Sequence, residues 1–163
     1  MVARVAFSDE ALSELGWMTV VYTYLEECIA NFASAFEDPS DPKLHIPVIA
    51  RKGLCDKLKL LRYAALQAAN KHSLAPPASE LDATLNQIRN AAERRDDLVH
   101  GFVKLGDSDA PGAQRIHKAR PPHPITPEEV RSTTACLYAA RDGLEKILVP
   151  LWNDIVRKRL RSP

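Results

Sequence analysis

The amino-acid sequence predicts an all-α fold, a mainly antiparallel four-helix bundle of long helices with an irregular or hairpin segment before the last helix. Four stretches carry apolar residues at alternating spacings of three and four, the period of a helix that buries one face. Glycine is scarce, at 6 of 163 residues, which disfavours a β-sandwich or barrel with its many turns. Helices with one apolar stripe each bury those stripes most simply against one another. The length fits a single domain over residues 1–163.

The first helix is predicted over residues 8–38. Its apolar stripe consists of Leu15, Met18, Tyr22, Leu25, Ile29, Phe32 and Phe36. Ser8 is a suitable N-cap, and two acidic residues follow it in the first turn, where the helix dipole favours negative charge. Pro39 and Pro42 cannot continue a helix, so a connector is expected to about residue 50.

The second and third helices are predicted over residues 52–72 and 79–101, separated by Pro76 and Pro77. The stripe of the second is formed by Leu54, Leu58, Leu61, Ala65 and Ala68. The stripe of the third is formed by Leu81, Leu85, Ile88, Ala92, Arg95 and Val99. Arg95 therefore occupies a position where an apolar residue is expected.

The helical period disappears between residues 102 and 125. Two short runs, 102–105 and 113–118, flank a cluster of turn-forming residues, so they are predicted to pair as a hairpin or to stay irregular. The last helix is predicted over residues 126–160, with Thr126 as its N-cap. Pro150 lacks a backbone N–H and is expected to kink this helix.

Bulk charge does not indicate a nucleic-acid or membrane protein. The formal net charge is +1, and no segment approaches the apolar length of a membrane span or of a secretory leader. A basic cluster near the C-terminus is either a solvated helix end, favoured by the helix dipole, or a contact to RNA phosphates. This cluster consists of Arg157, Lys158, Arg159 and Arg161.

The cysteines give no indication of a metal site. Cys28, Cys55 and Cys136 lie inside apolar helical patterns and are expected to be reduced core thiols of a cytoplasmic protein. The sequence contains no CxxC pair and no HExxH motif, so neither a metal nor a cofactor is predicted.

One segment combines residue types that can do chemistry. Arg95-Asp96-Asp97-Leu98-Val99-His100 has an arginine, a polar residue next to it, and a histidine after four intervening positions. This segment resembles the motif of the HEPN superfamily, which has an arginine and a histidine separated by four to six residues. The resemblance implies a helical bundle that is commonly dimeric. In many members it also implies a metal-independent ribonuclease, often a toxin of a toxin–antitoxin or phage-defence system.

These residue types suit RNA cleavage without a metal ion. Asp96 and His100 are i,i+4 neighbours on an ideal helix, so the carboxylate can hydrogen-bond the imidazole and fix its tautomer. His100 can transfer protons while the ribose 2′-OH attacks phosphorus, and Arg95 can stabilise the charge of the phosphorane. Arg95 and His100 lie about 140° apart around the helix, so a site that uses both is predicted to need a second copy of the chain.

Further cations and partners belong to the same hypothesis. The residues expected to hold flanking RNA phosphates are Arg89, Arg94, Arg157, Lys158 and Arg159. The expected partners are a second copy of the chain, RNA, and a cognate antitoxin or other partner protein.

Two other interpretations fit the same residues. Arg95 can pair with Glu93 or Asp96 at a helix boundary while its stem covers apolar surface, and His100 can be a helix C-terminal residue favoured by the dipole. The chain is then a non-catalytic HEPN-like module that binds a nucleotide, RNA or a partner protein. A purely structural helical dimer needs only the apolar stripes.

Overall fold

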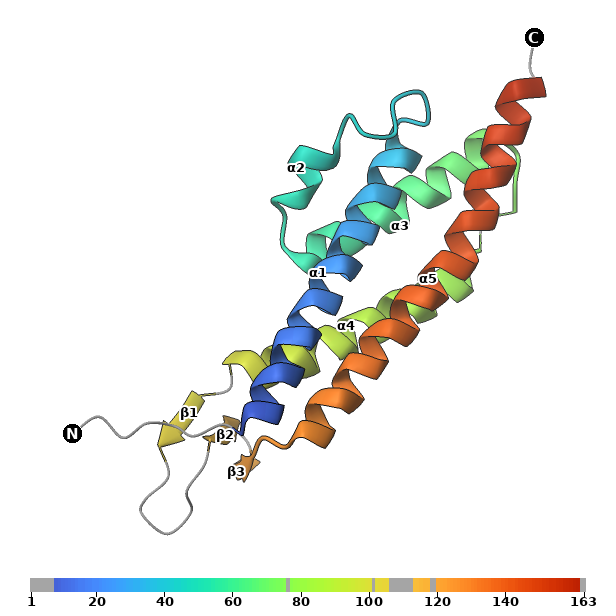
Figure 1. Cartoon of the computed structure of the whole chain (residues 1–163). Coiled ribbons are helices and arrows are strands. Elements are labelled where there is room, and N and C mark those ends of the chain that lie inside the picture. Colours follow the sequence, from blue (N-terminus) through green and yellow to red (C-terminus); the bar gives the residue numbers. More distant parts are fainter. Residues whose placement is uncertain (1–7, 76, 101, 106–112, 118–119, 162–163) are drawn as a thin grey trace.

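The computed structural model describes residues 8–75, 77–100, 102–105, 113–117 and 120–161. The helices are α1 (Asp9–Glu37), α2 (Ile46–Ala50), α3 (Leu54–Lys71), α4 (Ala78–His100) and α5 (Pro127–Arg161). The strands are β1 (Phe102–Leu105), β2 (Ala113–His117) and β3 (Arg120–Pro124). The predicted all-α class is confirmed, with four long helices and the hairpin segment before the last of them (Figure 1).

The sequence signals that limit the helices act as expected. The Ser8 hydroxyl accepts a hydrogen bond from the Ala11 N–H at 3.1 Å, and the Thr126 hydroxyl accepts one from the Glu129 N–H at 3.2 Å. Helix α3 ends where Ser73 adopts a left-handed conformation, with φ of 52°. The N–H of the next residue, Leu74, reaches back to the carbonyl of Ala69 at 2.9 Å, which closes the helix end.

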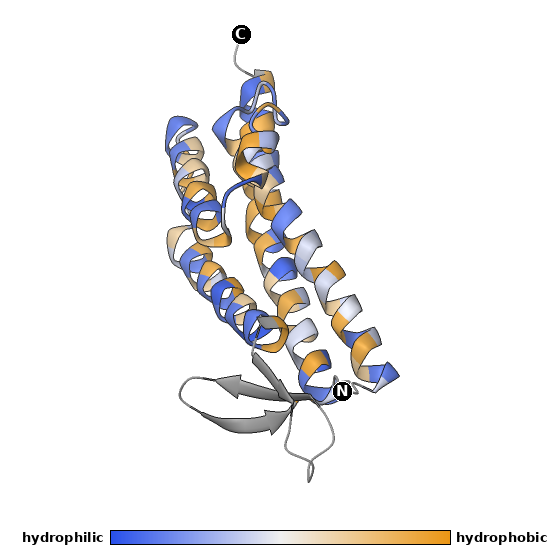
Figure 2. Cartoon of the chain, turned by 90° about the vertical axis from the view of Figure 1, so that its left-hand side faces the viewer, coloured by the Kyte–Doolittle hydropathy of each residue, from blue (hydrophilic) through white to orange (hydrophobic). Residues whose placement is uncertain are grey.

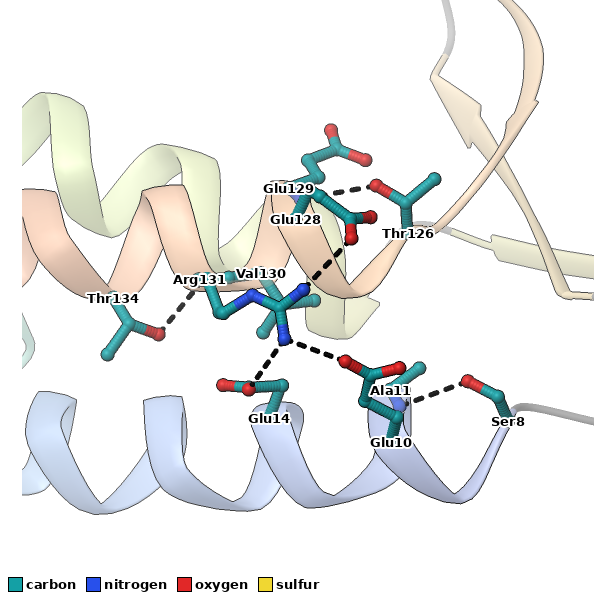
Figure 3. A network of polar contacts seen from close by, with 10 residues as sticks. All are labelled: Ser8, Glu10, Ala11, Glu14, Thr126, Glu128, Glu129, Val130, Arg131 and Thr134. Carbon is teal, nitrogen blue, oxygen red and sulfur yellow. Dashed lines mark hydrogen bonds and ion pairs between the residues drawn. The ribbon is translucent and has the colours of Figure 1, made fainter.

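Helix directions differ from the expected mainly antiparallel arrangement. The start of α1 lies beside the start of α5, because Arg131 forms ion pairs with Glu10 at 2.8 Å and Glu14 at 3.1 Å (Figure 3). Near their other ends, the rings of Phe36 and Trp152 are 5.9 Å apart, so the two helices are parallel. Helix α3 ends at the same end of the bundle as α1 and α5, and α4 runs the opposite way (Figure 1). The connector of residues 38–53 turns back along α1, which lets α3 run in the same direction as α1.

The core forms where the apolar stripes of the four long helices meet, and hydrophobic residues follow the facing sides of these helices (Figure 2). Its largest fully buried side chains are Met18, Leu25, Ile29, Leu58, Leu61, Leu81, Ile88, Val130, Leu137, Leu144, Leu148 and Ile155. Burial of these stripes is the main favourable contribution to the stability of the bundle. Within the described residues, no helix is both long and apolar enough to cross a membrane.

The hairpin expected before the last helix is present, and a third strand extends it. Strands β1 and β2 pair antiparallel, with Phe102 opposite Ile116 and Leu105 opposite Ala113. Strand β3 pairs antiparallel with β2 and forms an edge of the sheet, whose order is β1-β2-β3. Its prolines argue against a strand by propensity, but an edge position leaves one side of the backbone without a ladder to complete.

Two local expectations need correction. The connector after α1 contains the short helix α2, which the sequence pattern does not predict. Cys28 and Cys136 are half-buried, but Cys55 is exposed, because it lies in the first turn of α3 and away from the buried stripe. Helix α5 continues through Pro150 as one element with this proline on its exposed side, and the kink expected there stays a prediction.

Candidate functional site at the end of helix α4

The predicted catalytic residues lie in the last two turns of α4, which ends at His100. Because Arg95 occupies a stripe position, its side chain is directed towards α1 and is only 14% exposed. Its guanidinium carbon lies 4.6 Å from the centre of the Tyr22 ring, within the range of a cation–π interaction. The charged residue in the apolar stripe is therefore accommodated by an aromatic face rather than by solvent.

Asp96 compensates the charge of Arg95. The Nη1 group of Arg95 donates a hydrogen bond to Oδ1 of Asp96 at 2.8 Å, and the aspartate side chain is 55% exposed. The Nε group of Arg95 is buried and has no hydrogen-bond partner among the described residues. The intramolecular ion pair is one of the alternatives that the sequence left open, and it gives Asp96 a role beside Arg95.

The predicted hydrogen bond between Asp96 and His100 stays a prediction. His100 is the last residue of α4. Its side chain lies outside the part of the chain that is described, as does Gly101.

A chain of polar contacts continues from Tyr22 to the start of α3. The Tyr22 hydroxyl donates to Oε1 of Glu26 at 3.4 Å, and the same oxygen lies 3.3 Å from Nζ of Lys57. Lys57 is 5% exposed, so Glu26 balances a buried positive charge. Burial, and then the negative charges of Glu26 and Asp96, raise the pKa of Tyr22 to about 12 against the opposing effect of Arg95. The phenol is therefore neutral at physiological pH and can donate a hydrogen bond to Glu26.

Two of the expected phosphate-binding arginines belong to the same helix. Arg89 is exposed and its Nη1 donates to Oδ1 of Asn86 at 3.1 Å. Arg94 is exposed too, and its Nη1 lies 3.7 Å from the sulfur of Cys136 on α5. Both guanidinium groups are at the surface of α4, on the helix that carries Arg95.

The basic residues of α5 lie at the opposite end of the bundle (Figure 1). Nζ of Lys158 donates to the carbonyls of His72 at 2.6 Å and Ser73 at 3.1 Å, so it caps the end of α3. Arg157 forms an exposed ion pair with Asp154 at 3.5 Å, and Arg159 is exposed. Arg94 lies beside Cys136 on α5, and Cys136 precedes Arg157 by 21 residues, so the helix rise of about 1.5 Å per residue puts Arg95 roughly 30 Å away. The structure does not bring the tail and Arg95 together within one chain.

A separate groove of about 690 Å³ lies between α1, α5 and the connector. Cys28 and Phe32 line it from α1, and Arg141, Glu145 and Trp152 line it from α5. The Cys28 thiol lies 3.9 Å from a carboxylate oxygen of Glu145. Burial, and then the charge of Glu145, raise the pKa of Cys28 to about 11 against the effect of Arg141. This thiol is therefore protonated at neutral pH.

The sequence pattern predicts neither the contact of Tyr22 with Arg95 nor the groove, because both depend on which faces of the helices meet. Tyr22 belongs to the apolar stripe of α1, and the sequence contains no signal for which face of the neighbouring helix it meets. The only relevant signal was Arg95 itself, since a cation in a buried stripe needs a partner.

Within the described ranges, no three His, Cys, Asp or Glu side chains are grouped closely enough to hold a metal ion. Comparison with known proteins adds no relative, because no family model, no curated protein and no solved structure matches the chain.

Proposed function

We propose that this chain is a HEPN-like, metal-independent endoribonuclease that acts as a homodimer. The observation that carries the proposal is the fixed cation of Arg95, which is mostly buried on α4, 4.6 Å from the Tyr22 ring, and five positions before His100 on the same helix. A preoriented cation stabilises charge that develops in a transition state more effectively than a mobile one. The motif, the bundle and this geometry support the same activity.

The proposed reaction requires only groups of the protein and of RNA. The ribose 2′-oxygen bonds to the adjacent phosphorus while the bond from phosphorus to the 5′-oxygen breaks. The His100 of one copy takes the proton of the 2′-hydroxyl, the His100 of the other copy gives a proton to the leaving 5′-oxygen, and Arg95 stabilises the negative phosphorane. The products are a 2′,3′-cyclic phosphate and a 5′-hydroxyl, and DNA lacks the attacking group.

A second copy completes this site. Since Arg95 and His100 point about 140° apart on an ideal helix, one α4 cannot direct both at the same phosphate. Two copies related by a two-fold axis can direct an Arg95 and a His100 into one groove. A role as a toxin or defence effector, held by a cognate antitoxin, is part of the same proposal.

Cleavage of RNA in the presence of EDTA tests the activity. Purified wild-type chain is expected to cut RNA to products with cyclic phosphate ends and to leave DNA of the same sequence intact. His100→Ala and Arg95→Ala are expected to lose cleavage by at least about a hundredfold, as is typical for a proton-transfer group. His45→Ala is the matched control. His45 lies in the connector after α1, and its N–H donates to the hydroxyl of Ser34 near the end of α1, far from Arg95. No cleavage by wild type, or equal cleavage by His100→Ala, rejects the proposal.

A second candidate function is favoured by the ion pair of Arg95 and Asp96. A guanidinium that already pairs with a carboxylate binds a phosphate well only when that carboxylate moves away, which suits a non-catalytic module. Exposed apolar residues of α1 favour a protein partner for such a module: Trp17, Val20 and Tyr24 are 51%, 49% and 61% exposed.

Asp96→Asn separates the two functions. In a binding module the variant is expected to bind fluorescently labelled RNA more tightly, since it removes a charge that competes with phosphate. In the ribonuclease it is expected to slow cleavage, because Asp96 orients His100. Binding and cleavage measured on the same preparation distinguish these outcomes.

A further inference from the structure

Tyr22 links the cation of Arg95 to the interior of the bundle. The guanidinium lies against the ring at 4.6 Å, with the arginine side chain 14% exposed. Cation–π interactions are stronger when both groups are shielded from water. The ring is thus a defined contact for Arg95 on the side opposite to solvent.

The hydroxyl end of the same ring is held by α1 and α3. It donates to Glu26 at 3.4 Å, and Glu26 pairs at 3.3 Å with the buried Lys57. In this series of contacts the negative Asp96 is followed by the positive Arg95, the neutral Tyr22, the negative Glu26 and the positive Lys57. Each charged member therefore has a neighbour that favours its position, and the ring is fixed from both sides.

We infer that Tyr22 is a positioning residue for Arg95. Its ring fixes the orientation of the guanidinium that contacts an RNA phosphate at the end of α4. The identity of the phosphate as RNA rests on the proposed function, but the contact between the two side chains does not. An arginine loses rotamer freedom when it binds phosphate, and here that freedom is already lost before the ligand arrives. Tyr22 touches neither substrate nor reacting atoms in this scheme and acts through Arg95.

The contact can be measured without RNA by nuclear magnetic resonance. Protons above an aromatic face are shifted upfield, so the side-chain signals of Arg95, identified by their absence in Arg95→Lys, are expected upfield in the wild type. Tyr22→Phe keeps the ring and is expected to keep the shift, whereas Tyr22→Leu is expected to lose it. Arg141 lies 5.4 Å from the Tyr138 ring, so Tyr138→Leu is a matched control that should leave Arg95 unchanged.

Cleavage kinetics then test the consequence. Tyr22→Leu is expected to lower kcat about tenfold with KM within about twofold, the size of a shielded cation–π contact acting in the transition state. Tyr22→Phe and Tyr138→Leu are expected to stay within about twofold of wild type. Upfield signals that persist in Tyr22→Leu, or cleavage by this variant at the wild-type rate, overturn the inference.

The design separates this inference from the proposed function. A wild-type chain that cuts no RNA rejects the ribonuclease alone, and the resonance experiment then decides whether Tyr22 positions Arg95. Arg95 signals in the wild type at the position of a solvent-exposed arginine overturn the inference without any Tyr22 variant.

Discussion

At the scale of single residues, two mostly buried cations need partners inside the bundle. Arg95 is accommodated by Tyr22 and Asp96, and Lys57 is accommodated by Glu26. The sequence could predict Arg95 as unusual, because the stripe before it is regular. The expected member after it, Val99, is exposed, and Leu98 is buried instead. The sequence could not predict Tyr22 as the neighbour of Arg95, because periodicity defines a buried face and not the residue that this face meets.

The buried pair of Lys57 and Glu26 leads to a prediction about stability. Glu26→Gln leaves the 5%-exposed Lys57 without its counter-charge and is expected to lower the free energy of unfolding by about 1–2 kcal/mol. Lys57→Met removes the buried charge itself and is expected to cost less. Urea unfolding measures both variants.

An exposed pair provides the control for this comparison. Lys59 and Asp56 are 3.5 Å apart with side chains 75% and 66% exposed. Lys59→Met is therefore expected to change stability by less than about 0.5 kcal/mol. A loss in Lys59→Met as large as that in Glu26→Gln would show that burial of the pair does not determine its contribution.

Two raised pKa values predict a loss of stability in alkali. The native pKa is about 11 for Cys28, against an ordinary 9.0, and about 12 for Tyr22, against an ordinary 10.0. As pH rises, the unfolded chain loses these protons at a lower pH than the folded chain. The contribution of each group to the free energy of unfolding is therefore complete below its ordinary pKa and is lost as pH rises through its native pKa. The free energy of unfolding is expected to fall between about pH 9 and 12.

Two variants test whether Cys28 and Tyr22 cause this decrease in the free energy of unfolding. Cys28→Ala is expected to flatten the profile between about pH 9 and 11, and Tyr22→Phe between about pH 10 and 12. Chemical unfolding at a series of pH values measures the profiles. Unchanged slopes in both variants contradict the assignment.

At the scale of elements, the long helices could be predicted closely because both their stripes and their ends are local signals. Each predicted boundary of the four lies within two residues of the observed one, and Ser8 and Thr126 cap as expected. Helix α2 and strand β3 could not be predicted, because one is a single short helix and the other contains three prolines. Helix direction was missed as well, since an apolar stripe looks the same whichever way its neighbour runs.

Pro150 gives a prediction at this scale. It lies inside α5 and is exposed, so Pro150→Ala can restore a backbone hydrogen bond without creating a cavity. The variant is expected to raise the free energy of unfolding by about 1–3 kcal/mol. Pro127→Ala is the control, because proline is well tolerated at the first position of a helix and its removal should have little effect. Equal effects of the two substitutions in thermal unfolding would contradict this explanation.

At the scale of the whole molecule, the cations expected to bind RNA fall into two groups at opposite ends of the bundle. Arg89, Arg94 and Arg95 belong to α4, whereas Arg157 and Arg159 lie near the end of α5. Lys158 is held against the end of α3 and takes part in the fold. A single RNA that contacts both Arg95 and the tail on one chain must span roughly 30 Å, given the rise of α5 between Cys136 and Arg157.

This separation predicts how the tail contributes if the chain binds RNA. Replacing Arg157 and Arg159 by glutamine removes two phosphate contacts, so the slope of log affinity against log salt is expected to become shallower by about 1.4 for a single strand. The cleavage rate at saturating RNA should stay unchanged, because the tail is remote from Arg95. Replacing exposed Arg51 and Lys52 by glutamine changes the net charge equally and is the control. An unchanged slope would identify the tail as a solvated helix end, and a lower saturated rate would mean that the tail of one copy reaches the α4 site of another.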